Sequence, residues 1–125
     1  MRIFKTTWFT RFAGKERISD DELRKAVNLL EAGQARQQVG GADLGGDVYK
    51  IRVARPGEGK SGGYRVIVFF KSEERTFYAY GFAKSDRANI SQKELVKLKK
   101  QAKSLFSMSD VQITTALKER VLIEV

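Results

Sequence analysis

Residues 47–83 constrain the fold of this chain most strongly, because their apolar residues recur with the period of a β-strand. In the first part, apolar and basic residues alternate in the letters DVYKIRVA. Two further runs, YRVIVFFK and TFYAYGFA, are rich in β-branched and aromatic residues, and the first of them has the composition of a central strand. The polar letters SEER separate these two runs. We therefore predict three consecutive strands in an antiparallel meander.

Strict alternation within these strands predicts which side chains share a face. Lys50 and Arg52 would leave the same face of the first strand. In the third strand, three aromatic residues would share a face, namely Tyr78, Tyr80 and Phe82. Periodicity alone does not decide which face of the sheet is packed into the core.

The segments around the meander have helical patterns with defined starts. The letters RIFKTT suggest a short strand, and a short helix through Trp8 and Phe12 follows it. Ser19 begins a second helix, because S-x-x-E is a capping box and the apolar residues after it have helical spacing. The letters GQARQQVGGADLGG predict a mobile loop.

Two more helices and a strand are expected after the meander. A capping box starting at Ser91 precedes a helix that we expect to reach about Met108. Ser109 would cap a further helix that ends near Lys118, and the letters RVLIEV have strand character without an evident partner. The predicted fold class is α+β, with N-terminal helices packed on one face of a small antiparallel meander, C-terminal helices, and the other face open. We expect residues 1–125 to form one domain.

The composition narrows the kinds of function that the chain can have. It has 125 residues, a net charge of +9, no cysteine and no histidine. Without these two residue types, the common zinc sites and the Ser-His-Asp and Cys-His catalytic groups are excluded. No apolar run approaches the roughly 20 residues of a membrane span, and no secretory signal is evident. Without cysteine there is no disulfide framework, so we expect a cytoplasmic protein. The positive charge favours a polyanionic partner.

The letters ARPGEGKSGG raise the question of a nucleotide-binding P-loop. Such a loop holds phosphates with the N-terminus of a helix that follows its lysine and serine. Here Gly62 and Gly63 follow Ser61, and a strand begins directly after them. The segment is therefore either a plain glycine-rich hairpin loop or a basic arm, carrying Arg55 and Lys60, beside the cationic strand face.

Basic side chains gather around one predicted strand face. They are Lys50, Arg52, Arg55, Lys60, Arg65, Lys84 and Arg87. Such crowding of like charges destabilises a fold unless a partner compensates it. Tyr78 and Tyr80 could add stacking surfaces, since cations interleaved with aromatic rings are typical of sites for single-stranded RNA.

The letters DVYKIRV, GGYRVIVFF and RTFYAYGFAK together resemble the RelE toxins of bacterial toxin–antitoxin modules, within the RelE/ParE superfamily. The stretches FKTTWFTRFA, ARPGEGKSGGYR, YGFAKSDRANIS and LIEV resemble a RelE-like subfamily, so the likeness covers nearly the whole chain. The resemblance implies a compact α+β fold that binds RNA on a concave sheet face. It implies a toxin that cuts messenger RNA on the ribosome, needs no cofactor or metal, and is neutralised by a cognate antitoxin.

The resemblance also assigns site residues by motif. Lys50 and Arg52 match the basic pair of the family's first meander strand, and Arg65 matches the arginine of the next one. Lys84 and Arg87 lie in the segment that corresponds to a basic stretch after the third strand. Our hypothesis makes Lys50 the base for the RNA 2′-hydroxyl, because the like charges of Arg52 and Arg65 favour its neutral form. Arg52, Arg65 and Lys60 would hold phosphates.

Three alternatives stay open at this point. The chain could be a non-catalytic RNA-binding module or an inactivated toxin, because Ser85 and Ser91 stand nearest to the further arginine and the tyrosine of the prototype. It could act on a protein such as DNA gyrase, as ParE relatives do. It could be an adaptor for an acidic protein, with the lysine-rich helix after Ser91 as its contact.

Overall fold

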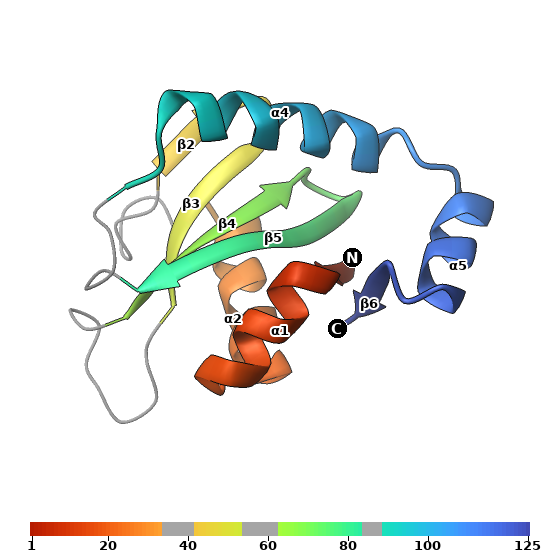
Figure 1. The fold of residues 1–125 in the computed structure, drawn as a ribbon, viewed down its shortest axis with the longest axis horizontal. Coiled ribbons are helices and arrows are strands. Elements are labelled where there is room, and N and C mark those ends of the chain that lie inside the picture. The colour runs from red at the N-terminus through yellow and green to blue at the C-terminus, as the bar shows by residue number, and fades with distance from the viewer. Residues whose placement is uncertain (34–41, 54–62, 84–88) are drawn as a thin grey trace.

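The fold is that of a computed structural model, which describes residues 1–33, 42–53, 63–83 and 89–125. The helices and strands follow one another along the chain as β1 (Arg2–Thr6), α1 (Thr7–Glu16), α2 (Asp20–Glu31), β2 (Ala42–Gly45), β3 (Val48–Val53), β4 (Tyr64–Phe70), β5 (Arg75–Ala83), α4 (Gln92–Phe106), α5 (Asp110–Lys118) and β6 (Leu122–Glu124). Figure 1 shows a twisted sheet with helices around it and the two chain ends close together. None of the described helices is long and apolar enough to span a membrane.

Hydroxyl side chains start the helices, as the sequence predicts. Ser91 and Ser109 each accept a hydrogen bond from the backbone three residues on, and the side chains of Glu94 and Gln112 complete both capping boxes. At α2, the Ser19 side chain accepts from the Glu22 backbone. These caps satisfy backbone N–H groups that a helix leaves without an internal partner.

The described strands form one sheet in the order β2-β3-β4-β5-β1-β6. The meander of β3, β4 and β5 is antiparallel and central, which confirms the prediction. The N-terminal strand β1 lies parallel to β5, and the C-terminal strand β6 pairs antiparallel with β1. The first and last strands of the chain thus extend the meander on its β5 side.

The expected loop before residue 47 contains a strand. Residues 42–45 form β2, which pairs antiparallel with β3. Glycines at 45 and 46, with φ of 85° and 61°, make the tight turn into β3, since left-handed backbone suits residues without a side chain. The prediction of a loop was wrong for residues 42–45, because the three glycines in the letters GADLGG are typical of a loop and this strand is short.

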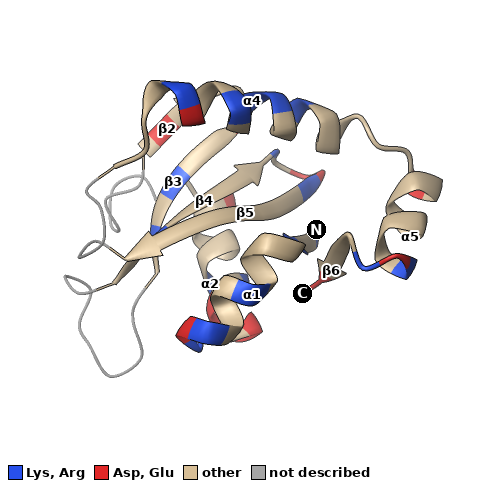
Figure 2. Ribbon diagram, viewed as in Figure 1, with Lys and Arg blue, Asp and Glu red and all other residues tan. Residues whose placement is uncertain are grey.

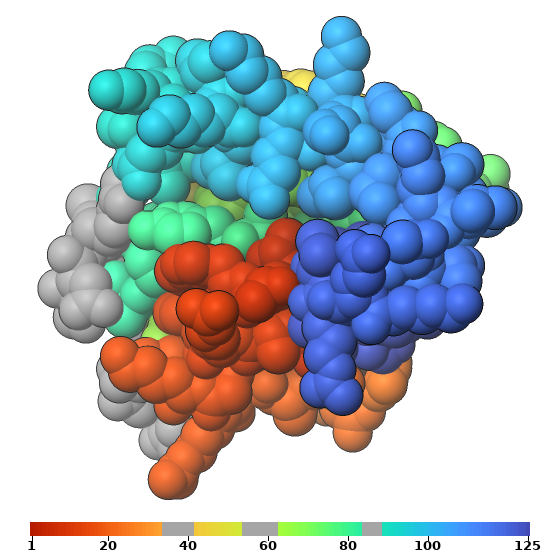
Figure 3. Space-filling model, turned by 45° about the vertical axis from the view of Figure 1, so that its right-hand side comes forward, coloured from red at the N-terminus to blue at the C-terminus, as the bar shows by residue number. Residues whose placement is uncertain are grey.

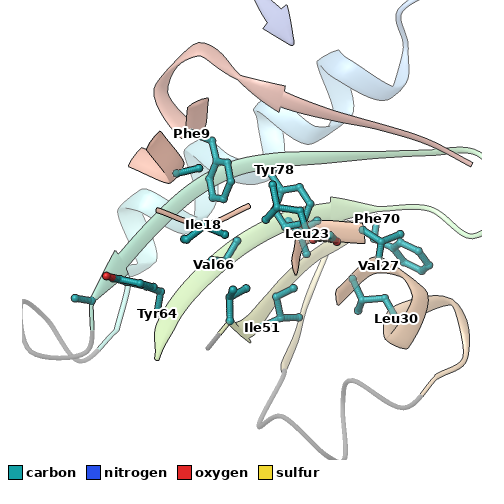
Figure 4. Close-up of a cluster of buried hydrophobic side chains, with 14 residues drawn as sticks. Phe9, Ile18, Leu23, Val27, Leu30, Ile51, Tyr64, Val66, Phe70 and Tyr78 are labelled. Carbon is teal, nitrogen blue, oxygen red and sulfur yellow. Dashed lines mark hydrogen bonds between the residues drawn. The ribbon is translucent and has the colours of Figure 1, made fainter. Parts of the chain in front are cut away.

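Helices cover both faces of the sheet, which corrects the expectation of one open face. On one face, α1 and α2 pack on strand residues such as Ile51, Val66 and Phe70 (Figure 4). On the other face, residues of α4 and α5 form a second core cluster with Val48, Ile67 and Phe69. The helix α4 has an apolar stripe as well as its lysines, and burial of that stripe requires a sheet surface beneath it.

Candidate functional site

Strands β3 and β4 place three cations on the same face of the sheet. Arg52 pairs with Arg65 across the two strands, and Lys50 pairs with Ile67. Because side chains alternate along a strand, Lys50, Arg52 and Arg65 all leave the face on which α4 packs. Lys50 and Arg65 are diagonal neighbours, which lie about 7–8 Å apart at their backbones. The predicted clustering of these three residues is therefore present.

Arg52 and Arg65 stand directly opposite each other on the two paired strands. Like charges at opposed positions of an antiparallel pair destabilise the sheet. The Nε atom of Arg52 and the Nη1 atom of Arg65 are buried, and neither has a hydrogen-bond partner among the described residues. Desolvation, and then the charge of Arg52, lower the pKa of Arg65 from its usual range. Both features favour an anion at this point, because an anion would accept these hydrogen bonds and compensate the repulsion.

The third cation, Lys50, forms a hydrogen bond with the segment that precedes α4. The Nζ atom of Lys50 donates a hydrogen bond of 3.3 Å to Oδ1 of Asn89, and the same oxygen accepts one of 3.0 Å from the backbone N–H of Ile90. Asn89 is not among the residues that the sequence pattern indicated for the site. The one feature of the sequence that could have indicated Asn89 is that it is a polar residue two positions before the N-cap residue Ser91. This contact ties the orientation of the Lys50 ammonium group to the start of α4.

A β-bulge in β5 decides which aromatic residues join the cations. Val68 pairs with Tyr78, but Ile67 pairs with Tyr80, so Ala79 is an extra residue and the alternation shifts by one. Tyr80, opposite Ile67, therefore faces the same way as Lys50, and Phe82, opposite Arg65, faces the same way as the guanidinium pair. The predicted shared face of the three aromatics is wrong for Tyr78, which lies on the other side.

Tyr78 belongs to the core. Its side chain is completely buried, and its hydroxyl donates a hydrogen bond of 2.7 Å to the backbone carbonyl of Leu23 on α2. Figure 4 shows the ring pointing into the cluster beside Leu23. Burial raises the pKa of this hydroxyl far above its usual range. The expectation that Tyr78 offers RNA a stacking surface is wrong, because neither ring face is accessible.

The comparison with protein families agrees with this architecture. A family model described as the RelE toxin of the RelE/RelB toxin–antitoxin system matches residues 1–125. The chain belongs to the RelE toxin family. It is therefore the toxin of a toxin–antitoxin pair, and the family implies a cognate RelB-type antitoxin as its partner.

Two groups of basic residues of this RelE toxin lie on the side of the sheet that carries the candidate site. Figure 2 shows basic residues on β3 within the sheet and a separate series along α4. The remaining residues that the sequence suggested for RNA binding lie outside the described residues, and they are Arg55, Lys60, Lys84 and Arg87. The described part of the candidate site consists of Lys50 with Asn89, the Arg52–Arg65 pair, and Tyr80 beside them.

Proposed function

We propose that this RelE toxin cleaves messenger RNA, on the ribosome, and inhibits translation until its antitoxin binds. The observation that carries the proposal is the Arg52–Arg65 pair, with two buried N–H groups that lack a partner among the described residues. A phosphate diester of RNA provides the negative charge and the acceptor oxygens that this pair requires.

The chemistry is attack of an RNA 2′-oxygen on the adjacent phosphorus. The new 2′-O–P bond forms while the bond from phosphorus to the 5′-oxygen of the next nucleotide breaks. A base must take the proton of the 2′-hydroxyl, cations must stabilise the charge that develops on phosphorus oxygens, and an acid must protonate the leaving oxygen. Side chains alone can meet these needs, so the proposed reaction uses no metal or cofactor.

Each described residue has a proposed role in this reaction. Arg52 and Arg65 bind the scissile phosphate and stabilise its additional charge. Lys50 takes the proton from the 2′-hydroxyl, and its contact with Asn89 orients it. Tyr80, on the same face, stacks on a base or supplies the proton to the leaving oxygen. Tyr78 has no role, because it is buried.

Induced expression in a bacterial host, without the antitoxin, tests this proposal. We expect the parent chain to arrest growth and to create new messenger RNA ends within translated codons. The double substitution of Lys50 and Arg65 by alanine should abolish both effects, while the purified protein keeps its thermal unfolding transition. A suitable control is Lys25→Ala on α2, which removes a basic residue 73% exposed in its side chain from the opposite side of the sheet.

The possible results separate the competing functions. Growth arrest without new RNA ends would contradict the proposal and favour a protein target such as DNA gyrase. RNA binding without growth arrest would indicate a non-catalytic module or an inactivated toxin. Full toxicity of the double variant would refute the assignment of Lys50 and Arg65.

A further inference from the structure

Trp8 is the only tryptophan of the chain, and it lies on the surface beside the candidate site. Trp8 is 44% exposed, whereas Phe9, on the same helix α1, is completely buried. The Trp8 ring packs on Tyr80 with 4.4 Å between centroids and 35° between planes, and it stacks on Phe12 at 5.4 Å and 18°. Aromatic packing therefore holds this exposed ring in place.

The start of α1 brings Trp8 to the rim of the cationic face. Thr6 ends β1, caps α1 by accepting from the backbone of Phe9, and donates from Oγ1 to the carbonyl of Ala79 in the bulge. The helix thus begins beside the segment of β5 that holds Tyr80. In Figure 3, atoms of β5 reach the surface between α1 and α4.

The rings and cations form rows across the sheet. One row runs from Trp8 through Tyr80 and Ile67 to Lys50, and the next contains Phe82, Arg65 and Arg52. Because neighbouring strands lie about 4.8 Å apart, Tyr80 is roughly 10 Å from Lys50 at the backbone. That separation is suitable for a single RNA strand that places a base near Tyr80 and a phosphate near Lys50.

We propose that Trp8, supported by Tyr80, is a stacking site for an unpaired base of the RNA whose phosphate binds Arg52 and Arg65. The inference rests on the proposed binding of RNA and adds a residue to that site. Every base has a flat π-face, so a stack of this kind holds single-stranded RNA without reading its sequence. The indole continues the ring packing of Phe12 and Tyr80 outward to the base.

RNA explains the surroundings of Trp8 better than a protein partner does. An exposed tryptophan alone is equally suited to a protein interface. Here, however, buried guanidinium N–H groups without a partner among the described residues lie one row away. A nucleotide carries a flat ring and a phosphate on one short linkage. Its base would stack on Trp8 while its phosphate binds the Arg52–Arg65 pair.

The fluorescence of Trp8 provides a direct test, because no other tryptophan contributes to it. The ligand is a short unpaired oligonucleotide with 2′-O-methyl groups, which cannot supply the attacking hydroxyl and so stays intact. We expect strong quenching of Trp8 on binding. An abasic oligonucleotide of equal length should bind more weakly and leave the fluorescence unchanged, since it has phosphates but no base to stack.

Variants at position 8 measure how much stacking contributes to affinity, through the anisotropy of a dye-labelled oligonucleotide. We expect Trp8→Leu to weaken binding by roughly tenfold, because it loses the flat ring, and Trp8→Phe to weaken it much less. The control is Val111→Ala on α5, which changes an apolar residue that is 75% exposed. The thermal unfolding of each variant shows that it is folded.

The outcomes distinguish this inference from the proposed function. If the oligonucleotide binds without quenching and Trp8→Leu binds as tightly as the parent, the stacking site is refuted and RNA binding stands. If no form of the protein binds the oligonucleotide, the proposed function fails as well. If only the purified antitoxin quenches Trp8, the residue belongs to a protein interface, which also overturns the inference.

Discussion

Two residues of β5 determine how the sheet and α1 fit together. Ala79 is the extra residue of the bulge, and it turns Tyr80 toward the cations while Tyr78 stays in the core. Gly81 then lies under Phe12 of α1. A Cβ atom at residue 81 would come within 2.6 Å of the Cε2 atom of Phe12. The absence of a side chain at Gly81 therefore allows α1 to approach the sheet and present Trp8 at its rim.

Gly81→Ala should accordingly destabilise the protein. The added methyl group would displace a Phe12 ring that packs against Phe9 and Tyr64, and overpacking of this kind costs about 1–3 kcal/mol. Urea unfolding measures the difference in the free energy of unfolding. Gly14→Ala is a matched control on α1, because a Cβ there meets nothing within 4 Å and alanine favours a helix. Equal stability of the Gly81 variant and the parent would contradict the close contact.

At the scale of elements, β6 is fixed to the sheet by its pairing with β1 and by an ion pair. The side chain of Glu124 accepts hydrogen bonds from Arg2 at 2.8 and 3.0 Å. The backbone N–H of Val125 donates to the carbonyl of Ile3 at 2.9 Å. The hydrogen bond from Arg2 lowers the pKa of Glu124 below its ordinary value. The contribution of this pair is small, because both side chains are well exposed.

The lowered pKa of Glu124 gives this pair a predictable pH dependence. Its stabilisation is fully present above the ordinary pKa near 4.5 and is lost as the pH falls through the lower pKa of the folded protein. We expect Glu124→Gln to reduce the free energy of unfolding by about 0.5 kcal/mol at pH 7 and by much less at pH 2. Urea titrations of parent and variant at both pH values measure this. A difference that is the same at both would show that the charge of Glu124 is not the cause.

For the whole molecule, the net charge of +9 raises the affinity for any polyanion. A test of RNA binding must therefore distinguish a specific site from attraction by the total charge. The distribution of the charge makes this possible. Arg65 lies on the sheet face that holds the guanidinium pair, whereas Lys25 lies on α2, which packs on the opposite face. Loss of either residue changes the total charge by the same amount.

The salt dependence of oligonucleotide binding should distinguish these two residues. For single strands, the logarithm of the affinity falls with the logarithm of salt with a slope of roughly −0.7 per phosphate contact. We expect Arg65→Ala to reduce the magnitude of the slope by about 0.7, and Lys25→Ala to leave it close to that of the parent. Binding titrations at several salt concentrations measure it. Equal slopes for the two variants would mean that only total charge matters.

Local patterns in the sequence determined most elements and part of the site. The serine caps, the helical spacing after them and the alternation in β3 depend on neighbours along the chain, and the structure has these elements in place. The alternation of β3 also placed Lys50 and Arg52 on one face, and Arg65 joined them because β4 pairs with β3 in a regular register.

Only the tertiary structure decided the rest, because those features depend on contacts between distant segments. The partner of β6 is β1, more than a hundred residues away along the chain, and strand letters carry no information about pairing. The bulge at Ala79 places Tyr78 and Tyr80 on opposite faces of the sheet, although strict alternation would place them on the same face. The contact of Trp8 with Tyr80 and that of Asn89 with Lys50 join elements whose relative positions are set by core packing. The sequence thus determined which chemical groups are present, and packing decided which of them meet.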